Sequence, residues 1–487
     1  MPLERSSPRY SDFSQAVRRY PPSLFLPALA AHTAELDPLI RGRDNSQGGR
    51  WPWAASAMAR ESVLHSNEWR HGGTPTEADF ARLYNQFNNS FDPQDDPSLS
   101  DIMTPLVYEQ FGYTESEFEE LSRTWALFGD PTLGTPIPWD EVFGIGLAEA
   151  ARAALVLHAW VANNGGFIDF NLLNAQHFQE VFDRIAPRAE LERLISYFTT
   201  NVDGARALYS EARLVAPHRQ RFAFNPFVAR PLIDLGTGGV WAPQSMLVSR
   251  AIFPSNLYYV GIRRWGLPFA ENLGARVEQY VGRQLGLMAD GHIEGEILYG
   301  KGDKSVDWIW VTDRAVVLLE CKSARMTLGA KAADSSLGAV VARSLGKARE
   351  QIDRTASLIQ SRHVAFAHIP ADRPIIGLIV TAEPFYLGNA GALPEYGARG
   401  TTPTQVMSLR ELERFVCLDE QEAVALLQSV LADPERRTWS MASVMKDLGD
   451  VGKNPILEQA WSKYNYLDQD GLESARGEAP TERPGRI

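Results

Sequence analysis

Cysteine is almost absent from this sequence, with only Cys321 and Cys417 in 487 residues. So few thiols exclude a disulfide framework and a zinc site built from several cysteines. Long apolar runs are lacking too, because the most apolar stretch, Gly146 to Val161, is interrupted by Glu149 and Arg152. It is too short and too charged to cross a bilayer. We therefore expect a cytoplasmic protein with neither a secretory leader nor a membrane partner.

Positive charge is also scarce, and the formal net charge of the chain is -12. An acidic chain does not bind nucleic acid over its whole surface, because phosphate binding depends on Lys and Arg. The exception is the segment from Lys301 to Arg362, where eleven basic and seven acidic residues give a local net charge of +4. This asymmetry predicts that any nucleic-acid contact lies in that segment.

The length of the chain predicts more than one hydrophobic core. Apolar residues recur at helical spacing through the first half, for example at Phe80, Leu83, Tyr84 and Phe87. We expect an α+β protein overall. Its predicted parts are a mostly helical domain of unassigned role over 1–256, an α/β domain over 265–425, a helical extension over 426–466 and a disordered tail over 467–487.

The second half alternates between helical and strand-like patterns. The expected elements are a helix over 269–287, strands over 293–299, 305–311 and 315–321, a helix over 337–360, strands over 375–381 and 404–407, and a helix over 409–416. Three successive strands with short links predict an antiparallel meander, and the long helix then returns the chain to a further strand. The order αβββαβ with a mixed central sheet is the predicted fold of this domain.

The sharpest chemical signal lies in two neighbouring strands. A two-residue turn at Asp313-Arg314 would pair Thr312 with Ala315. The same register places Asp307 directly opposite Glu320, on one face of the sheet. Lys322 shares that face because side chains alternate with a period of two.

Two carboxylates at this separation repel each other unless a cation lies between them. Oxygen ligands favour Mg²⁺, which can polarise a phosphoryl oxygen and activate a water. Lys322 would orient or deprotonate that water, or stabilise the charge that develops on phosphorus. The competing interpretation of Glu320 and Lys322 is an ordinary solvated ion pair at the end of a strand.

Together, Glu278, Asp307, Glu320-Cys321-Lys322 and Gln351 resemble the PD-(D/E)XK, or restriction-endonuclease-like, nuclease superfamily. The resemblance covers about 269–416 and departs from the family name where Val306 stands in place of Pro. It implies that Asp307, Glu320, the Cys321 carbonyl and Glu278 are metal ligands and that Lys322 is the catalytic lysine. Gln351 matches an accessory polar residue of the second helix. Glu271 competes with Glu278 for the acid of the first helix, and Glu294 and Glu296 are weaker alternatives.

A basic stripe follows the second helix of this unit at Arg343, Lys347 and Arg354. Next to a metal site such a stripe would contact phosphates. A solvated helix face is the alternative, and Glu350 and Asp353 interrupt the stripe.

These patterns predict a Mg²⁺-dependent nuclease, with Mn²⁺ able to substitute and with DNA preferred to RNA as the substrate. Restriction, anti-phage defence and repair are all compatible settings. The helical domain would bind a protein partner or form a homo-oligomer. Two alternatives stay open: a catalytically silent nucleic-acid-binding or scaffold protein on the same fold, and a nuclease that is active only with a partner.

Overall fold

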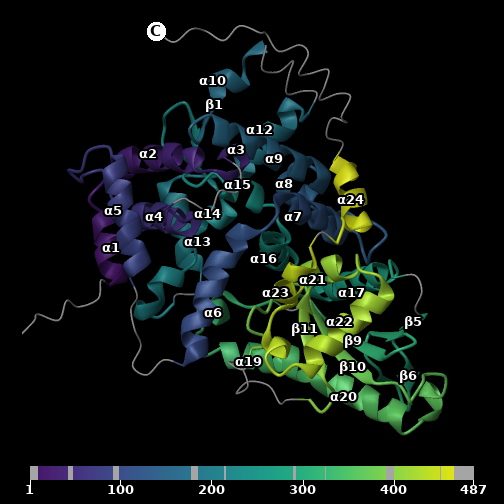
Figure 1. Ribbon diagram of the computed structural model, residues 1–487. Coiled ribbons are helices and arrows are strands. Elements are labelled where there is room, and N and C mark those ends of the chain that lie inside the picture. The colour runs from purple at the N-terminus through teal and green to yellow at the C-terminus, as the bar shows by residue number, and fades with distance from the viewer. Residues whose placement is uncertain are drawn as a thin grey trace, which may run out of the picture.

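The computed structural model describes residues 9–41, 48–90, 98–176, 185–212, 215–288, 292–323, 325–390, 400–449 and 451–464. Within them the chain is α+β, with a helical first half and a mixed sheet in the second half (Figure 1). The tail predicted over 467–487 lies outside the described residues. None of the described helices combines the length and the apolar character needed to span a bilayer.

The first half is built mainly from helices, as predicted. They are α1 (Tyr10–Val17), α2 (Pro22–Glu35), α3 (Pro38–Arg41), α4 (Pro52–His65), α5 (Glu77–Asn89), α6 (Leu99–Gln110), α7 (Glu117–Thr124), α8 (Asp140–Phe143), α9 (Leu147–Asn163), α10 (Phe170–Leu173), α12 (Arg188–Phe198), α13 (Val202–Glu211), α14 (Pro226–Ala229), α15 (Leu247–Arg250) and α16 (Pro254–Trp265). In α5 the Thr76 side chain caps the first turn, and the four apolar residues at helical spacing are all buried.

A small four-stranded sheet among these helices was not predicted. It consists of β1 (Phe167–Asp169), β4 (Gly239–Trp241), β3 (Leu232–Asp234) and β2 (Thr199–Thr200), in that spatial order. Strands of two or three residues are too short to show an alternating pattern in the sequence. Gly236 and Gly238 adopt positive φ in the connection between β3 and β4, which explains the glycines there.

The main sheet has five strands in the order β11-β10-β9-β8-β5. Their bounds are β5 (His292–Gly295), β8 (Trp308–Val311), β9 (Val316–Lys322), β10 (Ile375–Thr381) and β11 (Thr404–Ser408). β5, β8 and β9 form an antiparallel meander, while β10 and β11 run parallel to β9. Val311 pairs with Val316 and Trp308 with Leu319, so the register predicted from the turn is confirmed.

Helices cover both faces of this sheet. Alternate strand residues such as Val317 and Leu319 join one core cluster with α17 (Leu267–Leu285). The residues between them, such as Val316 and Leu318, join a second cluster with α19 (Leu337–Val341) and α20 (Lys347–Gln360). Figure 1 shows α17 and α20 on opposite sides of the strands.

Two element predictions need correction. The strand expected over 293–299 is divided into β5 and β6 (Leu298–Tyr299), and β6 pairs with β7 (Asp303–Lys304) in a separate hairpin. The strand expected from residue 305 begins only at Trp308, as β8. Gly300 and Gly302 adopt positive φ in the hairpin turn. The helix expected over 337–360 is interrupted by a π turn over Ala342–Gly346.

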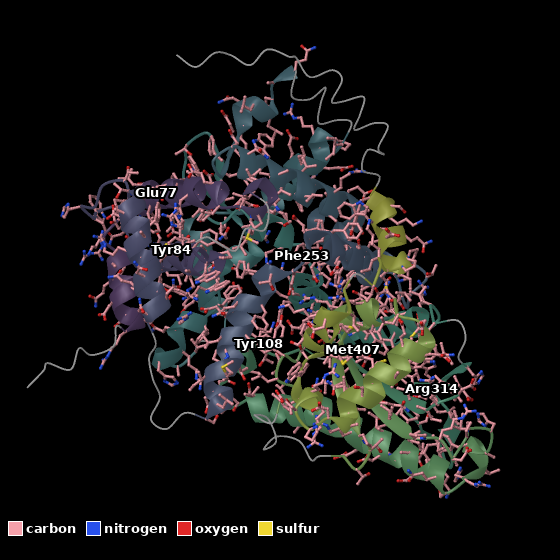
Figure 2. The ribbon with its side chains drawn as sticks, viewed as in Figure 1. Glu77, Tyr84, Tyr108, Phe253, Arg314 and Met407 are labelled. Carbon is pink, nitrogen blue, oxygen red and sulfur yellow. The ribbon has the colours of Figure 1, made fainter. Side chains whose placement is uncertain are left out.

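The two halves of the chain pack against each other. One core cluster contains residues from Leu121 to Tyr464, and Tyr108 of α6 donates a hydrogen bond to the Pro384 carbonyl just beyond β10 (Figure 2). The C-terminal helices are α21 (Leu409–Phe415), α22 (Glu420–Ala432), α23 (Met441–Val444) and α24 (Pro455–Trp461). α24 returns to pack against α7. The domain limits proposed from the sequence stay predictions.

Candidate active site

Asp307 lies at a bend directly before β8, and helix α20 holds this bend in place. The Gln351 side chain donates a hydrogen bond of 2.7 Å to the Ser305 carbonyl, and the Val306 amide donates to Thr355 at 3.2 Å. Asp307 accepts a 2.6 Å bond from the Cys321 amide of β9. The two strands therefore fix the carboxylate at their open end, and Gln351 acts on the backbone that carries it.

Glu320 and Lys322 occupy the end of β9, and the register that pairs Trp308 with Leu319 brings Glu320 opposite Asp307. The Lys322 ammonium donates a 2.5 Å bond to Glu320 Oε1. The Glu320 residue is only 3% exposed, and its Oε2 atom has no hydrogen-bond partner among the described residues. A buried carboxylate oxygen without a donor is costly, so this site is electrostatically incomplete as it stands.

The pKa values of the two acids reflect the same imbalance. Burial, and next to it the charge of Asp307, raise the pKa of Glu320 to about 7. Burial also raises the pKa of Asp307, although the Cys321 amide opposes the shift. Two acids with raised pKa values at one site are typical of functional sites, and a divalent cation would remove the cost of ionising both.

Glu278 approaches the pair from α17. The Trp308 indole donates a 2.9 Å bond to the Glu278 carbonyl, and Gly282 makes room for that ring, because a Cβ there would lie 2.2 Å from it. Burial and the charge of Asp307 raise the pKa of the Glu278 carboxyl. Glu271, the competing acid, is exposed on the same helix.

The fit to a metal ion rests on a small ligand set. No group of three or more His, Cys, Asp or Glu side chains within the described ranges is arranged to hold an ion by itself. Glu278 therefore does not complete such a group with Asp307 and Glu320, and its role as a ligand stays a prediction. Mg²⁺, however, commonly takes one or two carboxylates and fills its shell with waters and phosphate oxygens.

Cys321 adds one further oxygen to this set. Its amide faces Asp307 across the ladder, and a residue of an antiparallel strand turns its carbonyl toward the same neighbour as its amide. The Cys321 carbonyl thus lies on the Asp307 side of β9. Two carboxylates and one carbonyl suit a hard cation such as Mg²⁺ or Mn²⁺.

The basic stripe is exposed on the α19–α20 segment. Arg343, Lys347 and Arg354 form no hydrogen bond or ion pair with the part of the chain that the structure describes. Asp353, which interrupts the stripe, accepts bonds from the Thr401 and Thr402 amides. Its charge is therefore directed at the backbone and not at its basic neighbours.

One acid near the site was undervalued in the sequence, and an arginine that follows the site in the chain was missed. The charge of Glu296 contributes to the raised pKa of both Asp307 and Glu278, and Glu296 itself pairs with Lys304 at 2.9 Å. Arg325, three residues beyond Lys322, is 6% exposed, and its Nε and Nη2 atoms have no hydrogen-bond partner among the described residues. Its position shortly after the acid-x-Lys motif was the only signal in the sequence.

Comparison with family models, with curated proteins and with solved structures returned no match for this chain.

Proposed function

We propose that this protein is a Mg²⁺-dependent nuclease that hydrolyses phosphodiester bonds, with the fold of the PD-(D/E)XK superfamily in its second half. The observation that carries the proposal is the pair of half-buried Asp307 and buried Glu320, which have raised pKa values and lie beside Lys322 at the open end of two strands. DNA is the proposed substrate and internal cleavage the proposed mode. The free thiols Cys321 and Cys417 suit a reducing cytoplasm.

Asp307, Glu320 and the Cys321 carbonyl would hold the cation. When bound, Mg²⁺ polarises a phosphoryl oxygen and lowers the pKa of a water. Glu320 carries a proton for part of the time near neutral pH, because its pKa is about 7. Binding must displace that proton, so metal affinity should rise between about pH 6 and pH 8.

Lys322 is placed to act on the attacking water or on the charge that develops on phosphorus. Its side chain is 21% exposed, and its ammonium bonds only to Glu320 among the described residues. This ammonium would orient the attacking water or bind the phosphoryl group. The exposed stripe of Arg343, Lys347 and Arg354 would contact backbone phosphates further along the strand.

The decisive experiment is plasmid nicking with Mg²⁺ or Mn²⁺. Lys322→Ala should lower the rate at least about 100-fold, the usual contribution of a positioned acid or base, while the melting temperature stays near that of the wild type. Lys446→Ala, an exposed lysine on a distant turn, serves as the matched control. A Lys322→Ala protein that cuts as fast as the wild type would remove Lys322 from the mechanism.

The outcome for the wild type separates the remaining alternatives. A wild type that binds Mn²⁺ and DNA but cleaves only after addition of a cell extract would be a partner-dependent nuclease. One that binds neither ion nor nucleic acid would refute the proposed site altogether.

A further inference from the structure

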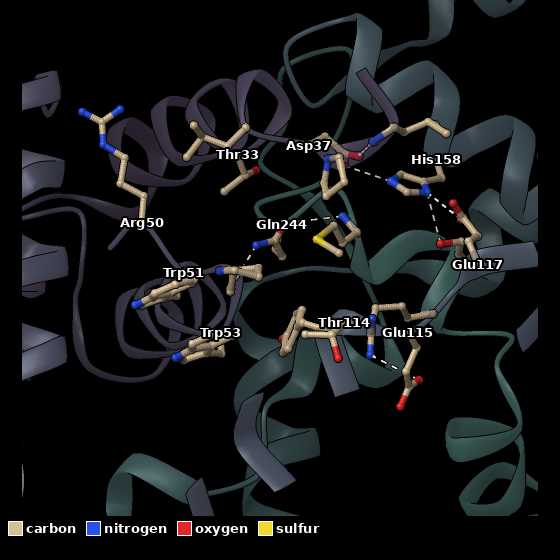
Figure 3. A pocket seen from close by; sticks show the side chains of 18 of the residues that line it. Thr33, Asp37, Arg50, Trp51, Trp53, Thr114, Glu115, Glu117, His158 and Gln244 are labelled. Atoms are coloured by element: carbon tan, nitrogen blue, oxygen red, sulfur yellow. Dashed lines mark hydrogen bonds and ion pairs between the residues drawn. The ribbon is translucent and has the colours of Figure 1, made fainter. Parts of the chain in front are cut away.

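A cavity of about 530 Å³ lies among the helices of the first half (Figure 3). Its walls come from α2, α4, α9, α15 and the segment that leads into α7. None of its lining residues belongs to the candidate active site. The volume falls within the range of about 300–1,000 Å³ that is usual for small-molecule sites.

One wall of the cavity is a stack of two indoles. The rings of Trp51 and Trp53 lie 5.0 Å apart at an interplanar angle of 5°, and Figure 3 shows them one above the other. Trp53 also contacts the ring of Tyr113 at 6.2 Å, which fixes the inner member of the stack. Trp51 remains 38% exposed. A rigid, partly exposed indole face is a stacking platform for a flat ring.

Positive charge lies at the rim of the cavity, where Arg50 is a lining residue whose guanidinium is turned away from Trp51 in Figure 3. Arg50 precedes Trp51 and pairs with Glu77 at 3.5 Å, but both side chains are exposed, so the pair is weak and can be exchanged for another anion. Helix α4 begins at Pro52, and no side chain caps its first turn. The positive end of this 14-residue helix therefore adds to the charge of Arg50 beside the indole stack.

The opposite wall holds a serine, a histidine and an aspartate, but its chemistry argues against a hydrolase. Ser249 Oγ lies 3.1 Å from His158 Nδ1, and Asp37 lies 2.9 Å from His158 Nε2. Glu117 also contacts Nδ1 at 2.8 Å. Burial alone would lower the pKa of His158, but hydrogen bonds to Asp37 and Glu117 raise it to about 10. The imidazole is thus protonated at neutral pH and cannot take a proton from Ser249.

Gln244 supplies a polar group between the two walls (Figure 3). It is 3% exposed, and its side-chain amide donates to the Pro52 carbonyl at 3.0 Å and accepts from the Met246 backbone amide at 3.4 Å. A carboxamide offers two donors and two acceptor positions, so one of each stays available for the edge of a heterocyclic ring.

We infer that this cavity binds a nucleotide whose base stacks on Trp51 and whose phosphate lies beside Arg50 and the first turn of α4. Gln244 would read the edge of the base. The ligand is either a free mononucleotide or the phosphorylated 5′ end of a nucleic-acid strand, since both present the same base and phosphate. This inference does not depend on the proposed nuclease activity.

The test is isothermal titration of the full chain with AMP, adenosine and ribose 5-phosphate, in EDTA so that metal-dependent cleavage cannot occur. A 5′-phosphorylated oligonucleotide and its 5′-hydroxyl form make up the second arm. Trp51→Ala should weaken AMP binding about tenfold or more, and Trp51→Phe should restore part of the loss. Arg50→Ala should weaken AMP binding but not adenosine binding. Trp69→Ala, which removes an indole that is 86% exposed outside the cavity, should change nothing.

Each outcome of the titrations either supports or overturns the inferred nucleotide site. Tighter binding of the phosphorylated oligonucleotide than of AMP, still sensitive to Trp51→Ala, would support the inference and identify a strand end as the ligand. The inference is overturned if AMP and both oligonucleotides fail to bind at millimolar concentration. Equal affinity for ribose 5-phosphate and AMP would also overturn it, because stacking would then contribute nothing.

Discussion

Two buried clusters of charge in this protein are built from similar groups and are in opposite states. In the cluster of Asp307, Glu320 and Lys322, the lysine bonds to Glu320 alone. Both acids have raised pKa values, and one oxygen of Glu320 has no donor among the described residues. In the cluster of Asp37, His158 and Glu117, one imidazolium lies between two carboxylates. Burial would raise the pKa of each acid there, but hydrogen bonds to His158 lower both pKa values.

This difference distinguishes a candidate functional site, the Asp307 cluster, from a structural cluster, that of His158. Both clusters contain two carboxylates and one cation, but the His158 imidazolium bonds to both of its acids and joins the starts of α3 and α7 to the second half of α9. A buried ion pair also joins the two halves of the chain, where Arg123 of α7 bonds to Glu413 of α21. In the Asp307 cluster the lysine bonds to only one of the two acids, so the cluster becomes more stable when it takes up either a proton or a cation.

The largest effect is expected from His158→Ala. Removing the imidazolium leaves Asp37 and Glu117 buried without their cation, which should lower the free energy of unfolding by about 3–5 kcal/mol. Urea unfolding at pH 6 measures this change, with the exposed His71→Ala as control. A decrease below about 1 kcal/mol would mean that the cluster does not support the fold.

The pH dependence of the wild type gives an independent check on the same cluster. The folded pKa of His158, about 10, lies above its unfolded value near 6.5. Its contribution is therefore complete below about pH 6.5 and is lost as the pH rises through 10. The stability of His158→Ala should fall less steeply over that interval.

Glu320→Gln should raise the free energy of unfolding above pH 7, whereas His158→Ala should lower it. The folded pKa of about 7 exceeds the unfolded value, so in EDTA the wild type loses stability as the pH rises from about 4.5 to 7. Glutamine cannot ionise and escapes that loss. At pH 8 the variant should be more stable by on the order of 3 kcal/mol, and at pH 4 the two proteins should be equal. Glu271→Gln, an exposed change on α17, should show no such trend.

The register of the site could be predicted from the sequence because local rules determine it. A two-residue turn fixes which residues pair, and alternation then fixes which side chains share a face, so the opposition of Asp307 and Glu320 followed from residues 312–315 alone. The strand over 375–381 was also correct in both bounds, since an apolar run that is short, rich in β-branched residues and preceded by Pro374 favours a strand over a helix.

The cavity and the His158 cluster could not be predicted in this way. Asp37, Glu117, His158 and Ser249 come from four separate elements, and only the packing of those elements brings them together. No periodicity or spacing in the chain encodes that proximity. Trp51 and Trp53 show the same limit, because nothing in the sequence indicates the exposed surface that the packing leaves on Trp51.

Asp307→Asn tests whether the Asp307 cluster, unlike the His158 cluster, binds a metal ion. The amide oxygen can still accept from the Cys321 amide, so the bend before β8 should survive, while one anionic ligand is removed. Removal of such a ligand should weaken Mn²⁺ binding about tenfold or more in a calorimetric titration. Asp303→Asn, in the exposed hairpin, is the control. Equal affinity of Asp307→Asn and wild type would exclude Asp307 from the metal site.

The smallest effect concerns the basic stripe, where the exposed charges have no internal partner among the described residues. If Lys347 and Arg354 bind phosphates, replacing both with Ala should make the plot of log affinity against log salt shallower by about 0.9 per phosphate on duplex DNA. A solvated helix face predicts an unchanged slope, as does the control pair of Lys446→Ala and Lys453→Ala on exposed turns. Measuring single- and double-stranded oligonucleotides side by side also decides which nucleic acid the stripe prefers, because the expected change in slope per phosphate is only about 0.7 on single strands.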